Sequence, residues 1–160
     1  MAGINYPGIV TPFYCNDGRG NFVLQKRSQN RKDEQGSWEM GGGRLSSFVS
    51  LDDNVLREVK KEYGCRGVIQ ERLHAHDIFR EQDGIKTHWV VIPYFIKVDP
   101  GEVKNNEPAK IDELGWFTLD SLPHPLHSGL RYTLQNFSVY FEKYSSLKKR
   151  SASTSLRSCY

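Results

Sequence analysis

The sequence of 160 residues lacks a long hydrophobic segment. Its longest apolar run covers residues 89–96 and is interrupted by Pro93. A membrane-spanning helix needs about 20 apolar residues, so the sequence predicts no transmembrane helix and no membrane partner. The first ten residues, MAGINYPGIV, also lack the basic and apolar regions of a secretory signal peptide. We therefore expect a cytoplasmic protein.

Cysteine is scarce, and Cys15, Cys65 and Cys159 lie far apart without paired spacing. This pattern predicts free thiols in a reducing compartment and no cysteine-based zinc site. The composition, with 38% apolar and 26% charged residues, excludes a disordered or collagen-like chain. A chain of this length is typical of one domain, and its core needs no disulfide.

Excess charge is also small, with a net charge of +3. Residues 145–160 hold four basic side chains and no acid, so the remainder of the chain is close to neutral. A surface for nucleic acid is therefore not indicated. We predict one domain over residues 1–144, followed by a basic, serine-rich and disordered tail over residues 145–160. An electrostatic tether to RNA or acidic lipid is the less favoured interpretation of this tail.

The sequence does contain a clear order of secondary-structure patterns. Strands are predicted over residues 8–14, 22–27, 38–40, 67–80, 85–98 and 114–118. Helices are predicted over residues 51–63 and 127–143. Pro12 should weaken the first strand or place it at an edge. Strands followed by a helix, then strands and a helix again, predict an α+β domain with a mixed β-sheet between helices.

Two carboxylates stand out on the first predicted helix. Glu58 and Glu62 are one turn apart, so they project from the same side, off the predicted buried stripe. Such a pair can share Mg²⁺ or Mn²⁺. The glycines at 41–43, predicted to form a turn, allow backbone to approach a metal or phosphate closely. These features suit phosphate chemistry, whereas the alternative is an ordinary solvent-exposed helix face on which Lys61 pairs with Glu58.

The residue order in this region, GSWEMGGGRLSSFVSLDDNVLREVKKEYGC, resembles the signature of the Nudix hydrolases. That signature reads G-x5-E-x7-R-E-U-x-E-E-x-G-U, where U is a bulky aliphatic residue. The positions that match it, in order, are Gly43, Arg57, Glu58, Val59, Glu62, Gly64 and Cys65. The resemblance extends over roughly residues 8–140, and it implies a Nudix-like α/β/α sandwich.

The sequence departs from the signature at two glutamates. Val49 replaces the first of them, and Lys61 replaces the first glutamate of the E-E pair. Phe48 stands where the family has a glycine. The resemblance implies that Glu58, Glu62 and the carbonyl of Gly43 hold the metal. Loss of one ligand and gain of a nearby cation should weaken the binding of a divalent ion.

The resemblance implies a Mg²⁺-dependent pyrophosphohydrolase that cleaves a nucleoside diphosphate linked to another moiety. Its expected catalytic residues are Glu58, Glu62 and Arg57. A catalytically inactive, nucleotide-binding Nudix module is the alternative. Candidates for phosphate or substrate binding are Arg27, Arg44 and Glu107, and Glu107 or Glu113 is also a candidate further metal ligand or general base. The sequence leaves open which nucleotide is the substrate and whether the chain forms a homodimer.

Overall fold

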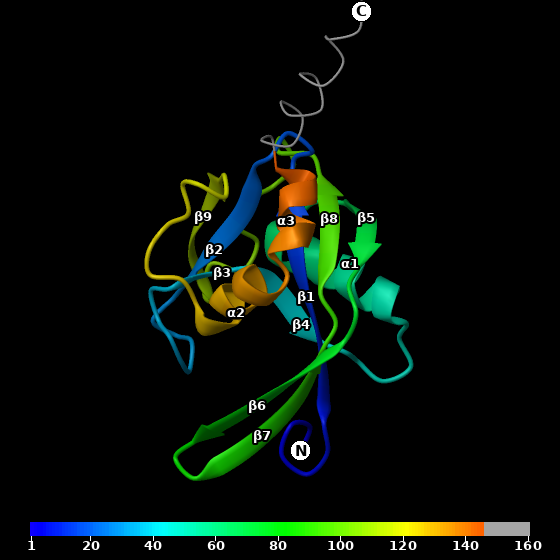
Figure 1. Cartoon of the computed structure of the whole chain (residues 1–160), viewed down its shortest axis with the longest axis vertical. Coiled ribbons are helices and arrows are strands. Elements are labelled where there is room, and N and C mark those ends of the chain that lie inside the picture. The colour runs from blue at the N-terminus through cyan, green and yellow to red at the C-terminus, as the bar shows by residue number, and fades with distance from the viewer. Residues whose placement is uncertain (146–160) are drawn as a thin grey trace, which may run out of the picture. The chain divides into compact units, whose positions relative to one another are not determined.

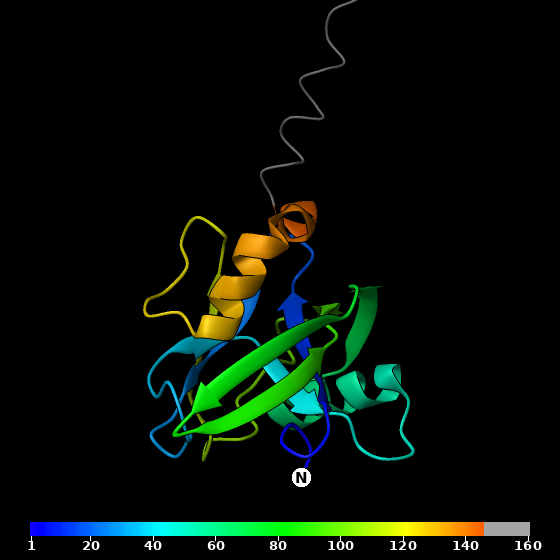
Figure 2. The same ribbon diagram turned by 60° about the horizontal axis from the view of Figure 1, so that its bottom comes forward.

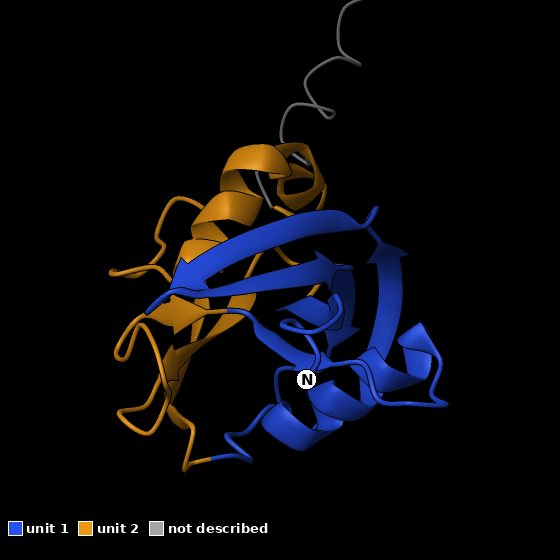
Figure 3. Cartoon of the chain, turned by 90° about the horizontal axis from the view of Figure 1, so that it is seen from below, with its two compact units in different colours: residues 1–15, 40–107 blue, residues 16–39, 108–160 orange. Residues whose placement is uncertain are grey.

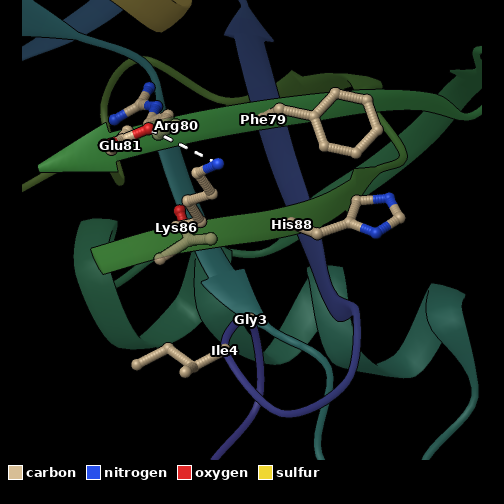
Figure 4. A pocket seen from close by; sticks show the side chains of 8 residues that line it. Gly3, Ile4, Phe79, Arg80, Glu81, Lys86 and His88 are labelled. Atoms are coloured by element: carbon tan, nitrogen blue, oxygen red, sulfur yellow. Dashed lines mark ion pairs between the residues drawn. The ribbon is translucent and has the colours of Figure 1, made fainter. Parts of the chain in front are cut away.

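The computed structural model of the chain describes residues 1–145 (Figure 1). These residues form two compact units (Figure 3). Unit 1 combines Met1–Cys15 with Met40–Glu107, and unit 2 combines Asn16–Glu39 with the chain from Pro108 onward. The predicted tail lies outside the described residues apart from its first residue, and a single domain over residues 1–144 stays a prediction. Within residues 1–145, no helix is long and apolar enough to cross a membrane.

Unit 1 is organised around its first strand. The strands of this unit are β1 (Gly8–Asn16), β4 (Gly41–Arg44), β5 (Gly67–Arg72), β6 (His76–Gln82), β7 (Ile85–Val91) and β8 (Tyr94–Val98). The last residue of β1, Asn16, is counted in unit 2. β1 pairs antiparallel with β4 and parallel with β7, and it also pairs with β8. Placing β1 at an edge because of Pro12 was therefore wrong, although Pro12 lies opposite Gly42 of β4 as a residue without an N–H.

Two strands that the sequence predicts as continuous are each broken in unit 1. The segment 67–80 forms β5 and most of β6, and the segment 85–98 forms β7 and β8. Pro93 lies at the second break, where it has no N–H to donate to a neighbouring strand. Its carbonyl accepts a hydrogen bond from the N–H of Leu73 at the first break (2.9 Å). Figure 2 shows the resulting β6–β7 ribbon, which pairs antiparallel along its length.

Helix α1 (Leu51–Tyr63) forms where the sequence predicts it. The Ser50 hydroxyl caps its N-terminus, and Gly64 ends it with a φ of 64° in the left-handed region. Val55, Val59 and Tyr63 of the predicted apolar stripe are fully buried, and Leu56 is half-buried. The ring of Tyr63 meets the ring of Phe13 edge-on, with centroids 5.4 Å apart. This packing fixes the rotation of α1 against β1, and so determines which other side chains of α1 face inward.

Unit 2 holds β2 (Phe22–Arg27), β3 (Trp38–Glu39) and β9 (Ile111–Phe117), with β2 antiparallel to both of the others. Two aromatic contacts contribute to its packing: Trp38 meets Phe117 edge-on at 5.0 Å, and Phe22 packs on Phe141 at 5.7 Å between centroids. Phe141 belongs to the C-terminal helical segment, so this segment is held to β2 by its apolar side.

The predicted helix over residues 127–143 is two helices, α2 (Ser128–Asn136) and α3 (Ser138–Tyr144). Phe137 separates them with φ −129° and ψ 25°, outside the helical range. Its N–H still bonds to the carbonyl of Thr133 (2.8 Å), so α2 closes its last turn before the chain changes direction. The apolar spacing continues through the break, which is why periodicity alone predicted one helix.

The fold class predicted from the sequence is confirmed. The β1–β7 pair is parallel, whereas β1–β4, β5–β8, β6–β7, β2–β3 and β2–β9 are antiparallel, so the pairing is mixed. The described residues contain three helices alongside these strands. The fold is therefore α+β with a mixed β-sheet.

Candidate active site

Helix α1 presents Glu58 and Glu62 to the glycines of β4. A Cβ on Gly43 would lie 2.5 Å from the carboxyl carbon of Glu58, and a Cβ on Gly41 would lie 2.7 Å from Oε2 of Glu62. The N–H of Gly42 donates a hydrogen bond to the same oxygen of Glu62 (3.2 Å). The triple glycine is a strand and not the predicted turn, but it does allow two carboxylates to lie directly against backbone.

Both carboxylates are buried, with Glu58 7% exposed and Glu62 4% exposed. The interpretation of these acids as an ordinary solvent-exposed face was therefore wrong, and so was their placement off the buried side of the helix. Burying an ionised carboxylate is costly unless it is paired, hydrogen-bonded or bound to a metal. The sequence retains two such groups one turn apart on a single helix.

Lys61 lies among the acids of this site. Its Nζ is 3.1 Å from Oε2 of Glu58 and 3.9 Å from Oε1 of Glu107. The hydrogen bond to Glu58 raises the pKa of Lys61 despite partial burial, with a further contribution from the charges of Glu58, Glu107 and Glu62. An ammonium group therefore stands between carboxylates at the position where the signature has a glutamate.

Arg57 holds the chain that follows β4. Its Nη2 donates to Oγ of Ser46 (2.8 Å) and to Oδ1 of Asn54 (2.7 Å), and it lies 3.8 Å from Oε1 of Glu58. Oδ1 of Asn54 also accepts the N–H of Ser46 (3.2 Å). A serine and an asparagine thus bind the guanidinium of Arg57.

Asn54 continues this network toward the glycine strand. Its Nδ2 donates to Oγ1 of Thr11 (3.0 Å), and that hydroxyl donates to the carbonyl of Gly43 (3.4 Å). Asn54 and Thr11 are both fully buried, and sequence reasoning missed them. The spacing of Asn54, Glu58 and Glu62 at i, i+4 and i+8 was the available signal, because it marks one line of polar residues along α1.

Phe48 keeps an unusual backbone conformation. It has a φ of 61°, and its side chain is fully exposed. The left-handed region favours glycine, the residue that the resemblance implies at this position. The loop between β4 and α1 therefore retains the backbone path that suits glycine, although this chain carries a bulky residue there.

The donor set fits one divalent cation. Two carboxylates and the carbonyl of Gly43 are hard oxygen ligands of the kind that Mg²⁺ and Mn²⁺ prefer. The Glu58 carboxylate lies directly against the backbone of Gly43. Within residues 1–145, however, Glu58, Glu62 and Glu107 do not form a group of three ligands within 4.8 Å of one another. Lys61 also neutralises part of their charge.

The other predicted binding residues differ in their surroundings. Arg44 follows Gly43 directly in β4, is exposed, and lies over the ring of Trp89 at 5.4 Å. Arg27 belongs to unit 2 and is buried, where its Nη1 donates to Oε2 of Glu39 (2.7 Å). The structure thus places Arg44 beside Gly43 and binds Arg27 to carboxylates, and a substrate-binding role for either stays a prediction.

A second polar cluster, in unit 2, was not predicted. Oxygens of Asp33 and Glu34 lie within 4.8 Å of a ring nitrogen of His127. Nδ1 of His127 accepts the N–H of Gly129 (3.0 Å), so the neutral ring carries its hydrogen on Nε2, which faces Oε1 of Glu34 (3.4 Å). A protonated ring nitrogen cannot bind a metal. Asp33 is also bound to the guanidinium of Arg27, so this cluster is better explained as structural.

Comparison with known proteins agrees with the geometry of α1 and β4. The NUDIX domain family matches residues 7–137. The MutT NUDIX hydrolase from Burkholderia pseudomallei has a similar structure, with a TM-score of 0.72 and 30% sequence identity. That match covers 82% of this chain and 98% of the other. The chain therefore belongs to the Nudix family, as the resemblance implied.

Other similar structures share the fold at lower identity. An ADP-ribose pyrophosphatase from Streptococcus suis 89-1591 matches with a TM-score of 0.62 and 23% identity, over 86% of this chain and 91% of the other. A UDP-X diphosphatase matches with a TM-score of 0.66 and 19% identity, over 89% of this chain and 64% of the other. Members of the Nudix family are pyrophosphohydrolases that act on small nucleotide substrates and generally use divalent metal ions.

A curated relative from Mycobacterium tuberculosis (strain CDC 1551 / Oshkosh), whose name contains the designation MutT4, is 28% identical over 89 residues. Those residues are 56% of this chain but 36% of the relative. The chain thus matches only about a third of that protein's length.

Proposed function

We propose that the chain is a pyrophosphohydrolase that uses Mg²⁺ or Mn²⁺ to cleave a nucleoside diphosphate linked to another moiety, with weakened activity. The observation that carries this proposal is the contact of Glu58 and Glu62 with Gly41 and Gly43. This contact supports the proposal because two buried carboxylates lie against the backbone of the glycine strand, where they would hold one ion against a diphosphate. The diphosphate substrates in the names of the similar pyrophosphatase and diphosphatase support this substrate class.

In this proposal each residue has a distinct task. Glu58, Glu62 and the Gly43 carbonyl would hold the ion, with Glu62 as the main ligand. When bound, the ion would offset charge on the diphosphate and favour attack of water on phosphorus. Arg57 keeps α1 and the loop after β4 in register through Ser46. Glu107 holds Lys61 from the side of the 99–107 loop.

Arg44 extends the same surface. It follows Gly43 in an exposed position, where its guanidinium can reach a phosphate oxygen in bidentate geometry. Its place over Trp89 restricts its freedom, so less entropy is lost when a phosphate binds.

The ion pair between Lys61 and Glu58 favours a second candidate, a nucleotide-binding module without catalysis. Lys61 supplies positive charge at 3.1 Å from Oε2 of Glu58, where a divalent ion would compete for the same oxygen. If Lys61 holds this oxygen throughout, phosphate is bound and not cleaved. The two candidates differ in whether a divalent ion can displace the ammonium.

Product release from a nucleotide panel separates these candidates. The panel contains nucleoside triphosphates, ADP-ribose and dinucleoside polyphosphates, each with Mg²⁺ or Mn²⁺, and compares the wild-type protein with Glu62→Gln. The hydrolase predicts metal-dependent release of a mononucleotide that Glu62→Gln abolishes. Equal rates for the two proteins at every metal concentration would remove the hydrolase and leave the binding module.

A further inference from the structure

A groove beside the C-terminal turn of α1 carries a concentration of positive charge. It has a volume of about 450 Å³. We call it the basic groove, and it is lined by Arg57, Lys60, Lys61, Gly64, Lys104 and Asn106. Four of these residues are cationic and none is acidic. A surface of this composition attracts anions, and phosphate groups are anions that Lys and Arg bind well.

The basic groove is built by main-chain contacts. The N–H of Lys104 donates to the carbonyl of Tyr63, and the N–H of Asn106 donates to the carbonyl of Glu62, both at 3.0 Å. The side-chain Nδ2 of Asn106 donates to the carbonyl of Lys61 (3.0 Å). These bonds satisfy carbonyls that the end of a helix leaves without partners. The loop before residue 108 is thereby fixed against α1.

Gly64 brings Lys104 close to the helix. A Cβ on Gly64 would lie 2.7 Å from Cε of Lys104, so the lysine stem rests directly on the glycine. The positive φ of Gly64 also favours glycine at this position. One glycine therefore both ends α1 and opens the space for a cation that comes from a distant part of the sequence.

Two cations of the basic groove are available for a ligand. Among residues 1–145, neither Lys60 nor Lys104 makes an ion pair with an acidic side chain. Lysines near the C-terminus of a helix do interact favourably with the helix dipole. The helix dipole explains Lys60 in the last turn of α1. It does not explain why Lys104, on the 99–107 loop, lies against Gly64.

The basic groove is continuous with the candidate active site. Arg57 and Lys61 line the groove and also contact Glu58, at 3.8 and 3.1 Å. An anion in the groove would thus lie next to the acids that face the glycine strand. A chain of phosphates can occupy the candidate active site and the basic groove together. One end would lie at the acids with a metal, and the next phosphates would contact the lysines.

We propose that the basic groove binds a chain of at least three phosphate groups without a divalent ion, such as the chain that a nucleoside triphosphate carries. The cleavage of a ligand bound in the groove rests on the proposed function, but the affinity of the groove for phosphate does not. Inorganic polyphosphate offers the same chemistry, so the test includes both sources. Lys60 and Lys104 would contact these phosphates, and neither lysine has a role in the proposed function.

Isothermal titration in EDTA with ATP and with inorganic tripolyphosphate tests this site. The wild-type chain should bind both, and Lys60→Gln/Lys104→Gln should bind both roughly tenfold more weakly because two exposed charge contacts are lost. The control Lys32→Gln/Lys97→Gln removes two exposed lysines outside the groove and should match the wild type. Tighter binding of ATP than of tripolyphosphate identifies the nucleotide as the ligand, and equal binding identifies the phosphate chain alone.

Two results would overturn the basic groove as a phosphate site. The first is binding that appears only when Mg²⁺ is added, and the second is equal affinity of the groove variant and the wild type. Thermal unfolding of both double variants shows whether each protein is folded. If the groove variant is unfolded, Lys60→Gln alone is the milder change for the same titration. Glu62→Gln separates this proposal from the function above, because it should abolish hydrolysis and leave binding in EDTA intact.

Discussion

Buried carboxylates occur in both units, but their partners differ. Glu39 in unit 2 accepts hydrogen bonds from Arg27 (2.7 Å), Arg31 (2.9 Å) and Gln25 (3.1 Å). The side chain of Arg27 is 7% exposed, whereas Lys61, the partner of Glu58 in unit 1, is 49% exposed. A carboxylate bound by a buried guanidinium group is part of the fold. A carboxylate paired with a half-exposed lysine can exchange that partner for another cation.

The largest predicted effect comes from breaking the buried pair in unit 2. Arg27→Met removes the buried guanidinium that Glu39 and Asp33 share, so that Glu39 keeps only Arg31 and Gln25 as partners. We expect the free energy of unfolding to fall by about 3 kcal/mol or more. Urea denaturation followed by fluorescence measures it. A loss below about 1 kcal/mol would mean that the Arg27 pair is no more structural than a surface ion pair.

The next largest effect is expected at the glycine strand. Gly41→Ala places a Cβ against the ring of Phe13 and within 2.7 Å of Oε2 of Glu62. Overpacking of this kind costs about 1–3 kcal/mol, and it should also abolish the metal-dependent activity. The matched control is Gly101→Ala, where a Cβ would approach only the side chain of Asp99, at 3.3 Å. Equal stability of both variants would show that β4 has room for a side chain.

Removing the unit 1 ion pair should affect stability much less. Lys61→Ala breaks the contact with Glu58 at the half-exposed end of the pair. We expect a change in the free energy of unfolding of less than about 1 kcal/mol, because water can take the place of the half-exposed lysine and Arg57 remains 3.8 Å from Glu58. If Lys61→Ala destabilises the chain as much as Arg27→Met does in the same denaturation experiment, the ion pairs of the two units do not differ in their contribution to the fold.

The smallest expected effect is that of pH on this ion pair. The pKa of Lys61 is raised above its usual value of 10.5, chiefly by the hydrogen bond to Glu58. The stabilisation by a group with a raised pKa is complete below its unfolded pKa and is lost only as pH rises through the folded value. Between about pH 6 and pH 9, the contribution of Lys61 to the free energy of unfolding should therefore not change with pH. A difference between wild type and Lys61→Ala that varies across this interval would contradict the ion pair.

The sequence predicted the helix and its acids because local signals agree there. Ser50, the apolar stripe and Gly64 define α1, and the signature residues place Glu58 and Glu62 on it. The burial of these acids was not predicted, since their spacing alone does not show that a strand of glycines lies against them. Asn54 escaped notice because its partner Thr11 lies 43 residues earlier in the sequence.

The sequence was less informative where distant contacts decide the structure. Pro93 marks one strand break, but the matching break at Leu73 depends on a hydrogen bond between segments. Phe137 interrupts a continuous apolar spacing, so the division into α2 and α3 could not be read from periodicity. The basic groove combines Lys60 with Lys104 across 44 positions, a pairing that only the fold creates.

The most direct test of the central claim is the affinity for Mn²⁺, measured by titration calorimetry without nucleotide. The claim is that Glu58 and Glu62 hold one divalent ion against Gly43 and that Lys61 weakens this binding. Lys61→Glu should bind Mn²⁺ roughly tenfold or more tightly than the wild type, because a positive charge beside the ligands becomes negative. Glu62→Gln should bind it more weakly. Equal affinity of the wild type and Lys61→Glu would contradict the account.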